Sequence, residues 1–250
     1  MFYGVILVAL LPAAILFAYV WWVDRYRKEP PAQLAKGFLF GILSAFASVF
    51  LASLFEWTGL DVEPGPGDSV ALHMRHAFFA AAIPEETCKL LVLWLFLKGN
   101  PYFDERLDGI VYATCVGLGF ASIENVLYLL METDSVIATG IMRGLFAVPG
   151  HFCFAVIMGY FLARFRFGEI SAWTAFLGFW ALPVLLHGFY DTAVFCLQDD
   201  VGGSFMPAFV PVFLTVLIFF SLRWSVQSMK ELLAQDRSEE PPAGDDSLSA

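Results

Sequence analysis

Charged residues are scarce in this chain. Asp, Glu, Lys and Arg make up 15% of its 250 residues, whereas 59% are hydrophobic and 17% are aromatic. A soluble globular domain has about 25% charged residues and a smaller hydrophobic share. The composition therefore excludes a soluble globular protein and predicts a membrane protein, with the lipid bilayer as its surroundings.

Sequence signals of several functional classes are also missing. No basic patch is interleaved with aromatic residues, so we predict no nucleic-acid partner. No glycine-rich loop carries the Lys and Ser/Thr of a phosphate-binding loop. The four cysteines form no Cys-x-x-Cys pair, which argues against a disulfide framework.

Long apolar runs dominate the sequence. Each of seven runs is long enough to cross about 30 Å of hydrocarbon as a helix. They cover residues 2–23, 37–57, 76–97, 109–131, 136–162, 171–197 and 205–224. We therefore predict an all-α fold, a polytopic membrane bundle of about seven transmembrane helices within a single domain, residues 1–230. The acidic segment 231–250 is predicted to be a disordered tail.

Basic residues fall on alternate connections between these runs. Arg25, Lys98, Arg164 and Arg223 represent the basic connections, and the intervening ones are mainly acidic. The positive-inside rule then predicts a multi-pass cell-membrane protein with its N-terminus outside and its C-terminus in the cytoplasm. The first run is predicted to be a retained anchor, because no basic region precedes it.

Polar and ionisable side chains interrupt four of the apolar runs. They lie at residues 85–89, 122–125, 150–151 and 187–191. An acid or a Lys at mid-membrane costs roughly 2.5–3.5 kcal/mol. The five charged residues among them therefore imply on the order of 12 kcal/mol that pairing, water or a metal must offset. They are Glu85, Glu86, Lys89, Glu124 and Asp191.

The four helices are predicted to bring their polar groups to a similar depth. At 1.5 Å per helical residue, the key side chains lie about 10–22 Å below the outer ends of their spans. They are Glu85, Glu124, His151 and His187. Lys89 follows Glu85 by one helical turn, which leaves Glu86 directed elsewhere, and Asp191 follows His187 by one turn and can orient its ring. We expect one shared cavity.

Two histidines and several carboxylates in an apolar pocket suit the activation of water. Imidazoles and a carboxylate are the usual ligands of catalytic zinc, and a second carboxylate can then act as general base. The residues that would supply both sets are Glu85, Glu86, Glu124, His151 and His187. A metal-free site is the alternative, with a Glu/His pair activating water and Asn125 or a histidine stabilising the oxyanion.

Two other classes of protein use the same residue types. A proton-coupled transporter or channel would use acids, histidines and a broken helix as a proton relay, although the two halves of the chain show no internal repeat. A nonenzymatic scaffold would use them to hold helices together. His73 and His76 are predicted to be interfacial, and Gly117 with Gly119 to allow close helix packing.

Taken in order, the motifs resemble those of the PrsW-type intramembrane protease family. The matching segments are 24–30, 85–89, 108–112, 117–125, 150–151 and 187–191. The resemblance implies a metal-dependent protease, distantly related to the CAAX prenyl endopeptidases. It also implies a single-span membrane protein or peptide as the substrate, because the family's named member cleaves a single-span anti-sigma factor. Two other intramembrane protease classes are excluded, since the chain has neither His-Glu-x-x-His nor Gly-x-Ser-Gly.

Carried over by position, the resemblance implies specific roles. The expected catalytic residues are Glu85, Glu86, Glu124, His151 and His187. The expected supporting residues are Lys89, Asn125 and Asp191. Glu86, His151 and His187 are the expected ligands of zinc or another divalent metal. The related prenyl endopeptidases also allow a glutamate-dependent description without zinc.

Overall fold

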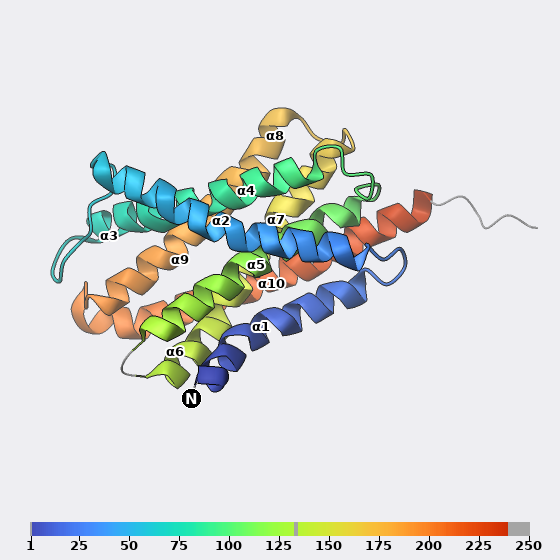
Figure 1. Ribbon diagram of the computed structural model, residues 1–250. Helices are drawn as coiled ribbons and strands as arrows, with labels where there is room; N and C mark the ends of the chain where they lie inside the picture. The colour runs from blue at the N-terminus through green and yellow to red at the C-terminus, as the bar shows by residue number, and fades with distance from the viewer. Residues whose placement is uncertain (1, 133–134, 240–250) are drawn as a thin grey trace, which may run out of the picture.

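A computed structural model describes residues 2–132 and 135–239, and within these ranges every regular element is helical (Figure 1). In chain order the elements are α1 (Phe2–Val23), α2 (Pro31–Trp57), α3 (Val70–His76), η1 (Ala77–Ala82), α4 (Ile83–Leu97), α5 (Arg106–Met131), α6 (Val136–Met142), η2 (Arg143–Ala147), α7 (Val148–Arg166), α8 (Ala172–Phe176), η3 (Leu177–Ala181), α9 (Leu182–Gln198), η4 (Gly203–Phe205) and α10 (Met206–Glu239). The predicted all-α bundle is confirmed.

Most of these helices have the length and composition of membrane spans. In the described part of the chain, six are long and apolar enough: Gly4–Val23, Pro31–Trp57, Arg106–Met131, Val136–Arg166, Ala172–Gln198 and Gly203–Glu239. Large apolar side chains such as Phe50, Val212 and Phe220 are exposed on their outer faces, which suits lipid and not water. The protein is therefore a multi-pass membrane protein. A further continuous helical segment, formed by α3, η1 and α4, carries Glu85 and Glu86 near its middle.

Three composite helices, α3–η1–α4, α6–η2–α7 and α8–η3–α9, share an irregularity next to the predicted site. In each, a π-helical segment ends two residues before a proline: η1 before Pro84, η2 before Pro149 and η3 before Pro183. Proline lacks an N–H and clashes with the carbonyl one turn earlier in an α-helix. A wider π turn relieves this conflict, as where the N–H of Ile83 reaches back five residues to the carbonyl of Phe78. Site residues follow each proline by one to four positions: Glu85 and Glu86, His151, and His187.

Local signals set several helix ends. The side chains of Glu105 and Asp108 form a capping box that starts α5. Beyond the ends of α4 and α7, the chain turns at Gly99 and Gly168, whose φ angles are 77° and 75°. Glycine tolerates this left-handed conformation because it has no Cβ. The capping box therefore sets where α5 begins, and the two glycine turns set where α4 and α7 end.

Helix α5 lies at the centre of the bundle, against α1, α2 and α7 (Figure 1). Glycines allow two of these close approaches. A Cβ added at Gly117 would lie 2.6 Å from the Cβ of Ala155 on α7, and one added at Gly119 would overlap the carbonyl oxygen of Phe38 on α2. The predicted packing role of this glycine pair is confirmed, and it places Glu124 one to two turns beyond a closely packed segment.

We expect Gly119→Ala to destabilise the protein by about 1–3 kcal/mol, because the new methyl group would overlap the backbone of α2. The measurement is the unfolding transition of the purified protein in detergent. Gly4→Ala is the matched control: it also lies in a helix, but no heavy atom lies within 4 Å of the place that its new methyl group would take. Equal stability of the two variants would show that α2 and α5 can separate at no cost.

The predicted boundary of the C-terminal tail at residue 231 is wrong. Helix α10 continues to Glu239. Leu232 is buried, and the carboxylate of Asp236 accepts hydrogen bonds from the backbone N–H groups of Arg106 at 3.1 Å and Leu107 at 2.9 Å. Docking against the start of α5 therefore orders a segment whose own composition favours disorder. The remainder of the predicted tail, 240–250, lies outside the described residues.

Candidate active site

Four predicted residues come together from three separate helices. Glu85 and Glu86 lie on α4, His151 on α7 and His187 on α9, and each offers a ligand atom within 4.8 Å of those of the others. The centroids of the two imidazole rings are 5.2 Å apart, and the ring planes are nearly perpendicular, at 89°. We call these four residues the Glu/His cluster.

Lys89 lies among the members of this cluster. Its ammonium group donates to Glu86 Oε1 at 2.8 Å, to Glu85 Oε2 at 3.3 Å and to His151 Nδ1 at 3.0 Å. The ammonium also lies 3.9 Å from the ring centroid of Phe120, in a cation–π contact. The expectation that Glu86 points away from Lys89 is therefore wrong, because residues three apart on a helix are neighbours as well as residues four apart.

Hydrogen bonds determine which ring nitrogen of His151 carries the proton. Because an ammonium group only donates, Nδ1 of His151 accepts from Lys89, and Nε2–H is left to donate to Glu124 Oε2 at 2.8 Å. His187 is oriented in a similar way. Its Nδ1 lies 2.9 Å from Glu86 Oε1 and its Nε2 lies 3.1 Å from Asp191 Oδ2. In both rings Nε2 thus contacts a carboxylate outside the cluster, whereas Nδ1 contacts Lys89 in His151 and Glu86 in His187.

Arg143 is a site residue that sequence reasoning missed. Its guanidinium donates to Glu124 Oε2 at 2.8 Å and to Asn125 Oδ1 at 2.7 Å, so it holds the carboxylate that orients His151. The available signal was an isolated arginine in an apolar span, eight residues before His151.

Asn125 does not join the Glu/His cluster. Its amide nitrogen donates to the carbonyl of Ala9 at 3.1 Å, and its amide oxygen accepts from Arg143. The side chain therefore ties α5 to α1 and to the arginine. Because both ends of the amide are already bonded away from the cluster, the alternative in which Asn125 stabilises an oxyanion is not supported by its position.

A cavity of about 420 Å³ opens onto the cluster. Its polar lining includes Glu85, Glu124, Arg143, His151, His187 and Asp191. The two neighbouring glutamates differ in access to it. The side chain of Glu86 is 0% exposed and is not part of the lining, whereas that of Glu85 lines the cavity and is 13% exposed. Water that enters the cavity can therefore reach Glu85 directly.

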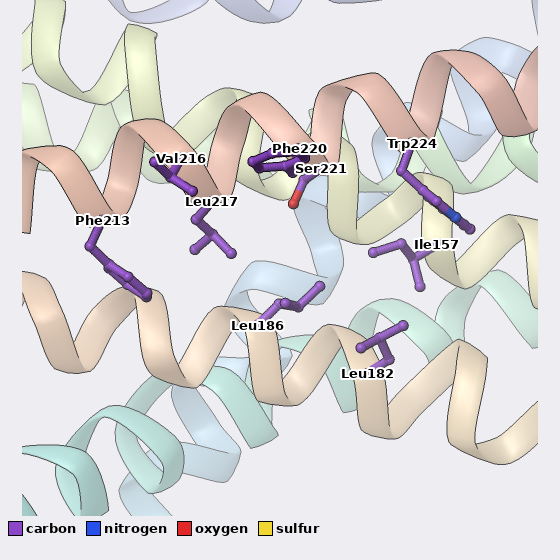
Figure 2. A pocket seen from close by; sticks show the side chains of 9 residues that line it. All are labelled: Ile157, Leu182, Leu186, Phe213, Val216, Leu217, Phe220, Ser221 and Trp224. Atoms are coloured by element: carbon purple, nitrogen blue, oxygen red, sulfur yellow. The ribbon is translucent and has the colours of Figure 1, made fainter.

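A second hollow, of about 410 Å³, lies between α9 and α10 and is almost entirely apolar (Figure 2). Figure 2 shows Leu186 of α9 facing Leu217 of α10, whereas Leu182 of α9 lies nearer Ile157 of α7. Leu186 directly precedes His187 in the sequence. Because residues of both helices also line the site cavity, the two hollows follow the same pair of helices. We call the second hollow the α9–α10 groove.

The other histidines lie outside the cluster. Nε2 of His73 is 3.0 Å from Asp199 Oδ2, beyond the end of α9, and Nδ1 of His76 is 2.9 Å from Asp61 Oδ1, in the connection after α2. Both therefore link α3 to neighbouring segments. Each of the chain's cysteines is buried and free, in agreement with the absence of a predicted disulfide framework.

The donor atoms of the cluster fit a divalent metal. Two imidazoles and a carboxylate form a common set of zinc ligands. A metal-binding histidine usually donates its second ring N–H to a carboxylate, which is the arrangement around His151 and His187. In addition, Oε2 of Glu86 is buried and finds no hydrogen-bond partner among the described residues. This oxygen is therefore free to bind a ligand that is not part of the protein.

Comparisons with known proteins point in the same direction. The sequence profile described as PrsW family intramembrane metalloprotease matches residues 29–221. The chain is similar to Protease PrsW of Geobacillus kaustophilus, with 35% identity over 83% of this chain and 86% of the relative. It is 35% identical to Protease PrsW of Clostridioides difficile over 74% and 76%, and 29% identical to that of Bacillus subtilis over 88% and 94%. No solved structure matches the chain significantly.

Proposed function

Because the chain belongs to the PrsW family of intramembrane metalloproteases, we propose that it hydrolyses a peptide bond in or near the membrane segment of a single-span membrane protein. An anti-sigma factor is a substrate of this kind. The observation that carries the proposal is the convergence of Glu85, Glu86, His151 and His187 beside a polar cavity. The N-terminus would face outside and the C-terminus the cytoplasm, as the basic connections favour.

Glu86, His151 and His187 would hold a divalent metal, with zinc as the first candidate. Such an ion, when bound, supplies Lewis acidity that polarises the scissile carbonyl and acidifies water. The contacts of Nε2 with Glu124 and with Asp191 orient the two rings, so that Nδ1 of His187 faces Glu86 and Nδ1 of His151 faces Lys89. They therefore position the imidazoles before substrate arrives.

Glu85 would be the general base. It is the cluster glutamate that lines the cavity, so it can take a proton from the attacking water and pass it to the leaving amine of the cleaved bond. The carboxylate of Glu86 is enclosed by Lys89 and His187 and has no such access. The neighbouring acids in the Glu85-Glu86 pair would thus have different tasks.

The α9–α10 groove would receive the apolar part of the substrate. Its lining is apolar, it lies between helices whose outer faces suit lipid, and it follows α9 toward His187. A transmembrane helix presents the matching surface, since its side chains are apolar on all faces. A soluble peptide would lose contact with water here without gaining a polar partner.

One observation favours a metal-free hydrolase as the second candidate. The ammonium group of Lys89 already lies between Glu86 and His151, where it neutralises buried carboxylate charge as a metal would. In that version Glu85 and a histidine would activate water, and Lys89 would stabilise the developing oxyanion. The difference between the two versions lies in their dependence on a metal.

The proposal is tested in liposomes that contain the purified protein and a single-span substrate of the anti-sigma factor type. We expect two product fragments whose new ends map by mass spectrometry to the membrane segment or its edge. Prior chelation should stop cleavage, and zinc or another divalent metal should restore it. Cleavage that survives complete chelation would support the metal-free version. Proton flux across the liposome membrane without any cleavage would instead identify a transporter and contradict the proposal.

A further inference from the structure

Two of the sequence motifs, residues 24–30 and 108–112, are not part of the active site, yet they meet in the structure. The carboxylate of Asp24 accepts a hydrogen bond from the backbone N–H of Glu29 at 3.0 Å. The hydroxyl of Tyr112 donates to Glu29 Oε2. The connection after α1 is thereby held against the first turns of α5.

Three carboxylates gather at this meeting point. Glu29, Asp104 and Asp108 each offer an oxygen atom, and these oxygens all lie within 4.8 Å of one another. Glu29 is 5% exposed and Asp108 is 0% exposed, whereas the side chain of Asp104 is 54% exposed. Two members are thus enclosed and the third is open to solvent. We call these three residues the Glu29 cluster.

One oxygen in the Glu29 cluster has no protein partner. Oδ2 of Asp108 accepts from the backbone N–H groups of Asp104 at 3.1 Å and Glu105 at 2.7 Å. Oδ1 of the same carboxylate is buried, and no hydrogen-bond donor in the described ranges reaches it. A buried carboxylate oxygen without a donor is costly. It points to a ligand that brings positive charge.

The protein supplies little positive charge here. Within the described part of the chain, Arg27 is the basic residue that forms an ion pair with a member of the Glu29 cluster: its guanidinium lies 2.7 Å from Asp104, and 2.8 Å from the adjacent Glu105. It forms no ion pair with the enclosed Glu29 or Asp108.

We propose that Glu29, Asp104 and Asp108 bind a hard divalent cation, such as Mg²⁺ or Ca²⁺. The donors are all carboxylate oxygens, which these ions prefer, in contrast to the imidazole-containing Glu/His cluster. The cation enters past the exposed Asp104 and completes its coordination with water. It fastens the connection after α1 to the start of α5, and so acts as a structural site separate from peptide hydrolysis.

The test is calorimetric titration of the purified, chelator-treated protein in detergent with Ca²⁺ and, separately, with Mg²⁺. We expect saturable binding of at least one of them in the wild type and at least tenfold weaker binding in Asp104→Asn, a substitution at an exposed side chain that leaves the buried core intact. Glu29→Gln is the second variant, because it keeps an acceptor for Tyr112 while removing the charge. It should weaken binding by at least the same factor.

Two controls separate this site from others. Glu63→Gln removes an exposed acid from the connection after α2 and should leave the affinity unchanged. Binding should also persist in Glu86→Gln, which alters the Glu/His cluster alone. The proposal is overturned if neither cation binds the wild type, if Asp104→Asn and Glu29→Gln bind as tightly as the wild type, or if Glu86→Gln abolishes binding.

Discussion

Glu86→Gln is expected to lower kcat/KM for peptide cleavage by at least about a thousandfold. The substitution keeps the size of the side chain but removes the carboxylate toward which Lys89 and the Nδ1 atom of His187 are directed. If Glu86 is a metal ligand, the variant should also lose its metal when analysed by elemental mass spectrometry. In that case the loss of activity follows from the loss of the metal.

Glu85→Gln is the informative comparison, because the neighbouring residue carries the same chemical group in a different position. As a general base that faces the cavity, Glu85 should also be needed for cleavage, and we expect a loss of about a hundredfold to ten-thousandfold. The metal content should stay near that of the wild type, since the assigned ligands are intact. Melting temperatures of both variants in detergent show whether the fold is retained.

The pair of results can contradict the assignment in a definite way. If Glu86→Gln keeps its metal and Glu85→Gln loses it, the roles of the two glutamates are reversed. If both variants cleave the substrate at the wild-type rate, the Glu/His cluster is not the catalytic site. Glu63→Gln, which removes an exposed acid in the connection after α2, should leave cleavage unchanged.

The fold and the members of the site follow from the sequence for one physical reason. Lipid offers the backbone no hydrogen bonds, so a long apolar run has to be a helix, and a charge within it has to find a partner. This reasoning identifies Glu85, Glu86, His151 and His187 before any coordinates are known. It cannot show how each side chain is directed.

Side-chain direction depends on departures from regular helix geometry and on contacts between residues that are far apart in the sequence. The π-helical segments before the prolines interrupt three helices. Residues beyond each segment therefore lie on a different helical face from the one that a count of 3.6 residues per turn predicts. Asn125 bonds to Ala9 and Arg143 reaches Glu124, which are contacts across 116 and 19 positions. The helical segment 231–239 is likewise ordered by the distant start of α5.

Lys89→Met is expected to destabilise the protein by about 3–5 kcal/mol. The lysine side chain is 2% exposed and contacts both cluster glutamates, so its removal would leave buried carboxylates without their counter-charge. Methionine has a similar length and would fill the space, so the loss is electrostatic and not a cavity effect. Lys36→Met, at an exposed position on α2, should change stability by less than about 0.5 kcal/mol. Unfolding in detergent measures both.

A double-mutant cycle isolates the pair that matters. If Lys89 mainly compensates Glu86, then Lys89→Met combined with Glu86→Gln should be more stable than the sum of the single losses predicts, by about 1–3 kcal/mol. Simple additivity would mean that the two residues do not act on each other. The charge of Glu86 would then be compensated by another partner, either a protonated His187 or a divalent ion held with His151 and His187.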